Sequence, residues 1–162
     1  MANQLLHEAH WNISILSVMV VSKQKKVSSR EGMKLTVETS PFYDGWLQTI
    51  EKDLQIAREA IICKDFEKLG KIVEANALKM HATMLGAEPP FFYWQSGTLE
   101  VMEQVQNLRL SGISVYFTID AGANVKVLCL PEYEEKVYKY LLTLPSVQEV
   151  ITCHPGAGIT YL

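Results

Sequence analysis

The sequence predicts an α+β fold in which helices pack on one face of a mostly antiparallel sheet. Three observations support this prediction. β-prone apolar runs occur near the start of the chain and in its last third, amphipathic helical patterns fill the middle, and the elements run strand, helices, two strands, helix, strands. No internal repeat, low-complexity tract or linker interrupts this order, so we expect one domain that spans residues 1–162.

The first predicted strand covers residues 11–22, where the pattern alternates at first and then becomes fully apolar. Such a change is typical of a strand that passes from a half-buried to a central position in a sheet. A basic cluster at Lys23, Lys25 and Lys26 follows at once. Basic clusters of this kind are most often solvated loops, but this one leads directly into a second polar motif.

That second motif begins at Ser28. Ser28 and Glu31 have the spacing of a capping box, which predicts the start of a helix with Ser29 and Arg30 on its first turn. Free main-chain N–H groups at such a start bind anions, and an arginine adds a planar fork that suits phosphate or carboxylate. The alternative is a capped helix with an exposed arginine and no ligand.

Three further helices are predicted in the middle of the chain. One starts at Ser40 and Pro41 and continues to residue 61, a second runs from Asp65 to His81, and a third occupies residues 96–110 before Ser111-Gly112. Their apolar residues recur at spacings of three and four. We interpret His81 as a packing residue, because no second His or Cys stands at metal-ligand spacing.

A hairpin follows, with strands at residues 113–119 and 125–130 and the turn sequence Asp-Ala-Gly-Ala-Asn between them. Asp120 lies where a mostly apolar strand opens into this small-residue turn. A carboxylate at such a point can be partly desolvated and still leave room for a ligand, as a catalytic acid or base requires. The structural alternative is that Asp120 only stabilises the turn.

The chain ends with a helix that starts at Pro131, whose charges complement the helix dipole, and with strand candidates at residues 147–153 and 158–162. The resulting arrangement is the ferredoxin-like form of an α+β sheet.

Composition limits the possible functions. Hydrophobic residues make up 48% of the chain and charged residues 20%, as in ordinary globular proteins, and the net charge of -3 argues against a general binder of nucleic acid or membrane surfaces. The three widely spaced cysteines favour reduced thiols, and the apolar run at residues 13–21 is too short to span a bilayer. We therefore expect a soluble, cytoplasmic protein.

Four motifs together resemble diphosphomevalonate decarboxylase. They are residues 28–33 (SSREGM), 38–43 (ETSPFY), 80–83 (MHAT) with the double proline at 89–90, and 116–124 (YFTIDAGAN). Their order and spacing match the carboxyl-terminal half of that family, which belongs to the superfamily of galactokinase, homoserine kinase, mevalonate kinase and phosphomevalonate kinase.

The resemblance implies ATP-dependent decarboxylation of mevalonate 5-diphosphate to isopentenyl diphosphate, a lyase reaction of isoprenoid biosynthesis, with ATP and Mg²⁺ as cofactors. Asp120 corresponds to the catalytic carboxylate that deprotonates the 3-hydroxyl. Ser29 and Arg30 match positions that hold the substrate's diphosphate, and Met33 matches an apolar neighbour of that site. The three lysines at positions 23, 25 and 26 match a basic stretch near the nucleotide.

Two departures from the family pattern stand out. The family usually has proline where Ala123 stands, so the turn here is expected to be less rigid. The Gly/Ser-rich phosphate loop of the family, with its companion arginine, belongs to an amino-terminal half that this sequence does not contain. The resemblance therefore implies the amino-terminal half as a partner, a homodimer for the whole enzyme, and no activity for this chain alone.

Other functions stay open at this point. A relative that decarboxylates the monophosphate, or a kinase that only phosphorylates the 3-hydroxyl, would share these motifs. A non-catalytic ligand-binding module with a ferredoxin-like sheet would need none of them.

Overall fold

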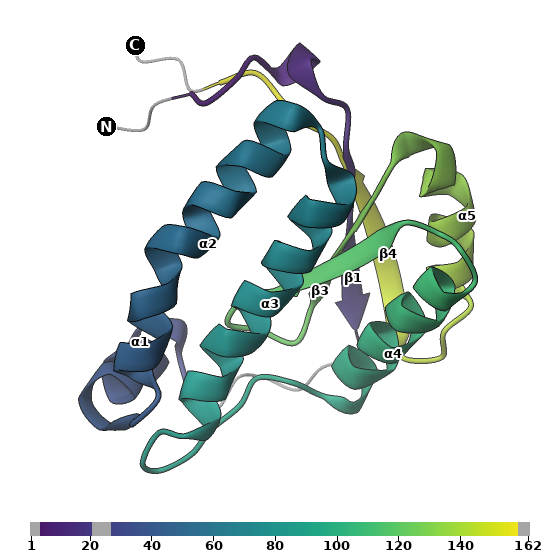
Figure 1. The fold of residues 1–162 in the computed structure, drawn as a ribbon. Helices are drawn as coiled ribbons and strands as arrows, with labels where there is room; N and C mark the ends of the chain where they lie inside the picture. The colour runs from purple at the N-terminus through teal and green to yellow at the C-terminus, as the bar shows by residue number, and fades with distance from the viewer. Residues whose placement is uncertain (1–3, 21–26, 159–162) are drawn as a thin grey trace.

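The computed structural model describes residues 4–20 and 27–158, and Figure 1 shows how their elements are arranged. After a short 3-10 helix at Glu8–His10, the chain forms five α-helices and one sheet. The elements, in chain order, are β1 (Ser14–Val20), α1 (Ser29–Thr39), α2 (Tyr43–Cys63), α3 (Phe66–Leu85), α4 (Ser96–Leu110), β2 (Val115–Ile119), β3 (Val125–Cys129), α5 (Pro131–Leu142) and β4 (Val147–Cys153).

The four strands form one antiparallel sheet in the order β2-β3-β1-β4. The α+β class and the antiparallel sheet predicted from the sequence are confirmed. The hairpin that carries Asp120 therefore forms one side of the sheet, and β1 enters next to β3, so that the end of β1 lies beside the Asp120 turn.

The main core fills the space between one face of the sheet and helices α4 and α5. It consists of inward side chains of the strands, such as Leu16, Phe117 and Val127, against Val101 of α4 and Leu141 of α5, all fully buried. These residues alternate along each strand, as expected for one face of a pleated sheet.

The opposite face of the sheet carries a second, smaller core beneath α3. Tyr116 and Leu128 point to this side and pack against Phe66. The close approach depends on Gly70, because a Cβ at this position would lie 2.0 Å from the Tyr116 ring. Helices thus cover both faces, where the sequence led us to expect one helical layer; Figure 1 shows α2 and α3 as an antiparallel pair on their own side of the sheet.

Charged side chains close the outer edge of β2. A carboxylate oxygen of Glu74 accepts a hydrogen bond from the Phe117 amide at 3.0 Å, and the Arg109 guanidinium donates to the Val115 carbonyl at 3.2 Å. Arg109 and Glu74 are themselves 2.9 Å apart, and the guanidinium lies over the Tyr116 ring. The edge strand that leads to Asp120 is therefore hydrogen-bonded on both sides.

Several element ends differ from the sequence prediction. The capping box at Ser28 and the start of α3 after Asp65 are confirmed. The prediction that Ser40 and Pro41 begin α2 is wrong: the Ser40 amide donates to Thr36 as the end of α1, and α2 begins at Tyr43.

The strand predicted at residues 11–22 begins at Ser14 and is described to Val20, and residues 21 and 22 lie outside the described part of the chain. Helix α3 continues past His81 to Leu85. Residue 158 is not in a strand, and residues 159–162 lie outside the described part of the chain. None of the described helices has the length and apolar character needed to cross a membrane.

Candidate active site

Asp120 follows the last residue of β2 and opens the turn to β3. Within the turn, the Gly122 amide donates to the Asp120 carbonyl at 2.7 Å. The carboxylate is not partly buried, as the sequence led us to expect, because 78% of the side chain is exposed. The side chain lies beyond the end of the apolar strand, where it can meet a ligand without first being uncovered.

Two side-chain hydrogen bonds fix the turn to neighbouring elements. The buried Thr98 hydroxyl, in the first turn of α4, donates to the Ala123 carbonyl at 2.6 Å and accepts from the Gln95 amide at 3.0 Å. The Asn124 side-chain oxygen accepts from the Val20 amide at 3.2 Å, which ties the turn to the end of β1. The turn is thus held in place although alanine occupies position 123.

His81 supports the same strand end from α3. It is 2% exposed, and its ring packs against Trp94 with the centroids 4.8 Å apart. Burial lowers the pKa of His81, although main-chain groups of Ile119 and Asp120 lie close enough to oppose this effect. A packed imidazole therefore lies behind the Asp120 main chain, and its Nε2 has no hydrogen-bond partner among the described residues.

The start of α1 is arranged as an anion site requires. The Ser28 hydroxyl accepts from the Glu31 amide at 3.2 Å, and the Glu31 carboxylate accepts from the Ser28 amide at 3.0 Å, which lowers the pKa of Glu31. These bonds leave the amides of Ser29 and Arg30 without a partner among the described residues. Ser29 is half-buried and Arg30 is exposed.

One segment joins the start of α1 to the Asp120 strand. The Tyr93 hydroxyl donates to the Ser28 carbonyl at 3.1 Å, and the next residue, Trp94, packs on His81. This chain of contacts brings Ser29 and Arg30 to the same region as Asp120, but no direct contact joins them in the described structure. Met33, one turn further along α1, is 65% exposed.

The predicted nucleotide-side residues Lys23, Lys25 and Lys26 lie outside the described residues. Their segment joins β1 to α1, and it follows Val20, whose amide is bound to Asn124 of the Asp120 turn.

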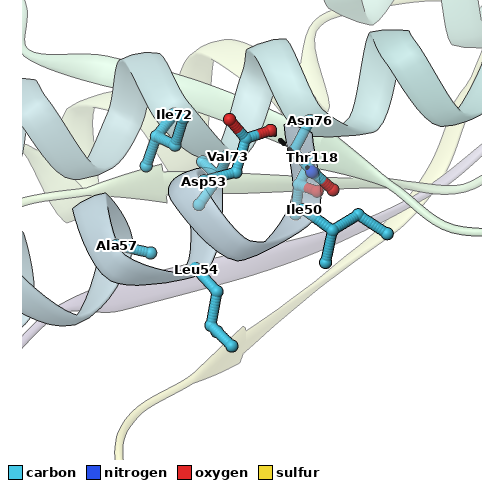
Figure 2. Close-up of a pocket in the computed structure, with 8 residues that line it drawn as sticks. All are labelled: Ile50, Asp53, Leu54, Ala57, Ile72, Val73, Asn76 and Thr118. Carbon is cyan, nitrogen blue, oxygen red and sulfur yellow. Dashed lines mark hydrogen bonds between the residues drawn. The ribbon is translucent and has the colours of Figure 1, made fainter. Parts of the chain in front are cut away.

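A groove between α2 and α3 is a separate feature that the sequence did not reveal. It encloses about 260 Å³, and Figure 2 shows its lining from both helices and from Thr118 of β2. Asp53, Asn76 and Thr118 supply its polar groups, and the rest of its lining is apolar: Ile50, Leu54, Ala57, Ile72 and Val73.

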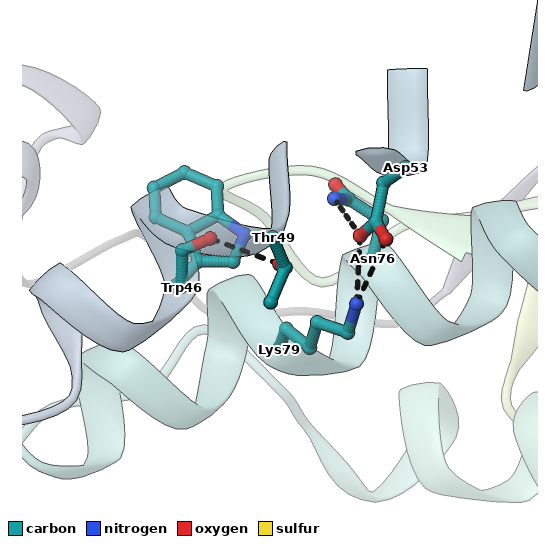
Figure 3. Close-up of polar contacts among 5 residues, drawn as sticks. All are labelled: Trp46, Thr49, Asp53, Asn76 and Lys79. Carbon is teal, nitrogen blue, oxygen red and sulfur yellow. Dashed lines mark hydrogen bonds and ion pairs between the residues drawn. The ribbon is translucent and has the colours of Figure 1, made fainter. Parts of the chain in front are cut away.

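Asp53 forms a polar network within this groove (Figure 3). Asp53 is 7% exposed, and its carboxylate accepts from Lys79 at 2.7 Å and from Asn76 at 2.9 Å. Burial alone would raise the pKa of Asp53, but the hydrogen bonds from Lys79 and Asn76 outweigh it and lower that pKa. The network joins α2 to α3. Its carboxylate is already paired with Lys79 and Asn76, so we do not assign it a catalytic role. The sequence feature that could have indicated this network is an aspartate on the otherwise apolar face of a predicted helix.

No group of three or more His, Cys, Asp or Glu side chains could hold a metal ion within residues 4–20 and 27–158. Within the described part of the chain, two features are open to a ligand: the exposed Asp120 carboxylate on its turn, and the amides at the start of α1.

Known proteins of one family resemble this chain. Residues 15–158 match the family model of the mevalonate 5-diphosphate decarboxylase C-terminal domain. The diphosphomevalonate decarboxylase of Saccharomyces cerevisiae is 32% identical over 148 residues, which cover 89% of this chain and 37% of the yeast enzyme. The chain thus spans less than half the length of the curated relatives it matches.

Solved structures give the same result. The mevalonate diphosphate decarboxylase from Enterococcus faecalis is 46% identical with a TM-score of 0.82, over 90% of this chain and 44% of that one. A protein designated MDDEF, in complex with MVAPP, AMPPCP and magnesium, is 48% identical with a TM-score of 0.84, over 90% of this chain and 45% of that one.

Proposed function

The chain belongs to the mevalonate 5-diphosphate decarboxylase C-terminal domain family, and from that premise we propose that it supplies the Asp120-bearing half of an ATP-dependent decarboxylase. The proposed substrate is mevalonate 5-diphosphate, and the products are isopentenyl diphosphate, ADP, phosphate and carbon dioxide. The observation that carries the proposal is the exposed Asp120 carboxylate on a turn that β1, α3 and α4 hold from behind.

Asp120 acts as the general base in this proposal. Its carboxylate accepts the proton of the substrate's 3-hydroxyl while that oxygen bonds to the γ-phosphorus of ATP and the bond to ADP breaks. The new phosphate then leaves with the carbon–oxygen bonding electrons, and the electrons of the breaking carbon–carboxylate bond form the alkene as carbon dioxide departs. Such phosphoryl transfer depends mainly on positioning, which a fixed turn provides.

The start of α1 binds the substrate's diphosphate. The free amides of Ser29 and Arg30 and the positive end of the helix dipole all favour an anion there. The exposed Arg30 guanidinium can donate hydrogen bonds to two phosphate oxygens at once. Met33 supplies an apolar neighbour to the carbon skeleton of the substrate. Met33 and Arg30 lie on the same helix, so one element would set both the charge and the orientation of the substrate.

ATP and Mg²⁺ are the proposed cofactors, with Lys23, Lys25 and Lys26 beside the nucleotide. The MDDEF complex, which contains AMPPCP and magnesium, supports ATP and Mg²⁺ as the cofactors. Mg²⁺ commonly binds through substrate phosphates and neutralises their charge. We assign it to the nucleotide phosphates.

The partner that completes the site is the amino-terminal half that the longer relatives carry. We propose that residues 1–162 form the carboxyl-terminal domain, that this domain alone is inactive, and that the complete enzyme is a cytoplasmic homodimer. The exposed, unpaired thiols of Cys63 and Cys153 suit a reducing compartment. Light scattering of the complete enzyme would test the dimer.

The test of the reaction is Asp120→Asn in the complete enzyme, meaning this domain joined to its amino-terminal half. The substitution keeps the shape of the side chain and removes the base, so turnover should fall by ~10²–10⁴ with substrate binding kept. A coupled assay of ADP release measures it, and Asp44→Asn, on the exposed first turn of α2, is the matched control. Turnover of Asp120→Asn within a few-fold of the unmodified enzyme would return Asp120 to a turn-stabilising role.

A second experiment tests the division into two halves. Calorimetry of this chain alone should detect no saturable ATP binding at sub-millimolar concentration, and the chain should release no phosphate from ATP with mevalonate 5-diphosphate present. Addition of the amino-terminal half as a separate chain should restore activity. Decarboxylation by this chain alone would refute the two-half arrangement.

A further inference from the structure

Lys126 lies against the Asp120 carboxylate. Its ammonium nitrogen is 2.5 Å from the Asp120 Oδ2 atom. The β2–β3 ladder explains the contact, because Lys126 is directly opposite Thr118, and Asp120 stands two positions after Thr118, immediately beyond the end of β2. Residues two apart on a strand point to the same face. The two charges therefore meet on the face of the sheet away from the main core.

The two partners of this ion pair differ in exposure. The Lys126 side chain is 30% exposed, whereas the Asp120 side chain is 78% exposed. In the pair between Lys139 and Glu135 on α5, the corresponding values are 71% and 82%. Lys126 thus reaches Asp120 from inside the fold, and most of the carboxylate surface is left to solvent.

Only one oxygen of the carboxylate is engaged. Lys126 contacts Oδ2, and no hydrogen bond to Oδ1 is found within the described part of the chain. A half-buried lysine held by its strand can fix the orientation of the carboxylate through one oxygen, and the other oxygen stays available to a hydroxyl group.

We propose that Lys126 is a positioning residue for Asp120 in the decarboxylation. The inference rests on the proposed function of Asp120. The ammonium holds Oδ2, so that Oδ1 faces the 3-hydroxyl of the substrate and accepts its proton. The ammonium charge also offsets the negative charge that the diphosphate, the nucleotide and Asp120 bring together. Lys126 itself exchanges no proton and forms no bond to the substrate.

This role predicts that turnover and stability respond differently to loss of the ammonium. An ion pair with one well-exposed partner contributes little to folding. Misplacement of a catalytic group by about 1 Å, in contrast, can reduce the rate by ~10²-fold. A purely structural lysine would show the opposite behaviour, with a lower melting temperature and little change in the rate of the folded enzyme.

The experiment is a double-mutant cycle in the complete enzyme. Lys126→Met removes the charge and keeps most of the side-chain length, and we expect kcat to fall by ~10–10²-fold. KM and the melting temperature should stay near those of the unmodified enzyme. Lys126→Arg keeps a positive charge and should restore part of kcat. In the Asp120→Asn background, Lys126→Met should have no further effect, because its effect acts through the carboxylate. Lys139→Met is the matched control, since it breaks an exposed lysine–carboxylate pair within α5 that does not include Asp120.

Two results would overturn the proposal. One is a kcat of Lys126→Met within twofold of the unmodified enzyme, and the other is an equal loss in the presence and absence of the Asp120 carboxylate. Full turnover by Asp120→Asn alone would instead overturn the proposed function, and it can be read before any Lys126 variant is made.

Discussion

Substitution of Thr98 by valine should destabilise the domain without opening a cavity. The Thr98 hydroxyl is fully buried and takes part in two hydrogen bonds, one accepted from the Gln95 amide and one donated to the Ala123 carbonyl. Valine replaces the hydroxyl by a methyl group of similar size. Thr98→Val therefore leaves a main-chain donor and a main-chain acceptor unpaired at the start of α4 and in the Asp120 turn.

The magnitude follows from the number of groups left unpaired. A buried polar group that loses its partner typically costs about 1–3 kcal/mol. Two such groups, with some relief from local adjustment and solvent entry, should lower the free energy of unfolding by about 2–4 kcal/mol. For a domain of this size, each kcal/mol shifts the melting temperature by roughly 2–4 °C. We expect a fall of roughly 5–15 °C.

The measurement is urea and thermal unfolding of this chain, followed by circular dichroism. Thr98→Ser is the matched control, because it keeps the hydroxyl and loses only one methyl group, at about 0.8 kcal/mol. In the complete enzyme, Thr98→Val should also lower kcat, since the Ala123 carbonyl belongs to the Asp120 turn. If Thr98→Val unfolds within about 0.5 kcal/mol of the unmodified chain, or if Thr98→Ser is equally destabilised, the two hydrogen bonds do not hold the turn.

Three further outcomes are expected. Gly70→Ala should destabilise the chain by about 1–3 kcal/mol in urea unfolding, because its Cβ would lie 2.0 Å from the Tyr116 ring; equal or greater stability would show that α3 can shift. Burial lowers the pKa of His81 below its ordinary 6.5, so the unfolded chain binds the proton first, and stability should fall as the pH drops below about 6.5. His81→Asn should flatten that dependence between pH 7.5 and 5.5, and an unchanged slope would assign it to other groups. Arg30→Lys in the complete enzyme should raise KM for the diphosphate substrate and slow turnover with little change in melting temperature, because lysine has one point charge in place of a planar fork; unchanged kinetics would leave Arg30 as a surface residue.

Local patterns in the sequence were sufficient to predict most elements of the fold. The capping box at Ser28 and the helix start near Asp65 were predicted correctly, and in each the side chain accepts from a main-chain amide three residues later. The start of α2 was predicted wrongly. Ser40 followed by Pro41 is a typical start of a helix, but here Ser40 ends α1, and α2 begins three residues later at Tyr43. Two helices in close succession make such signals ambiguous.

The second helical layer was harder to predict. Residues 115–119 are apolar except for Thr118, and such a nearly continuous apolar run is typical of a strand covered on both sides. That pattern does not say which helix covers which face, because the packing of α3 depends on Gly70 meeting Tyr116 across 46 positions of the chain. Tertiary contacts of this kind have no local signal.

In the candidate site, too, local features could be predicted from the sequence and most tertiary contacts could not. Asp120 and Arg30 could be singled out by residue type and by the turn and helix start that carry them. The contact between Asp120 and Lys126 follows from the hairpin register and could have been predicted once Thr118 was aligned with Lys126. The link from Ser28 through Tyr93 and Trp94 could not, since it requires the path of the 88–95 segment in three dimensions.

The charged pair on the outer edge of β2 bears on how the domain behaves in concentrated solution. A bare edge strand presents a row of main-chain donors and acceptors onto which another molecule can add a strand, a common route to aggregation. Here Glu74 already binds the Phe117 amide and Arg109 the Val115 carbonyl. The strand that leads to Asp120 is therefore a poor template for intermolecular strand addition, which favours study of the separate domain at the concentrations that calorimetry requires.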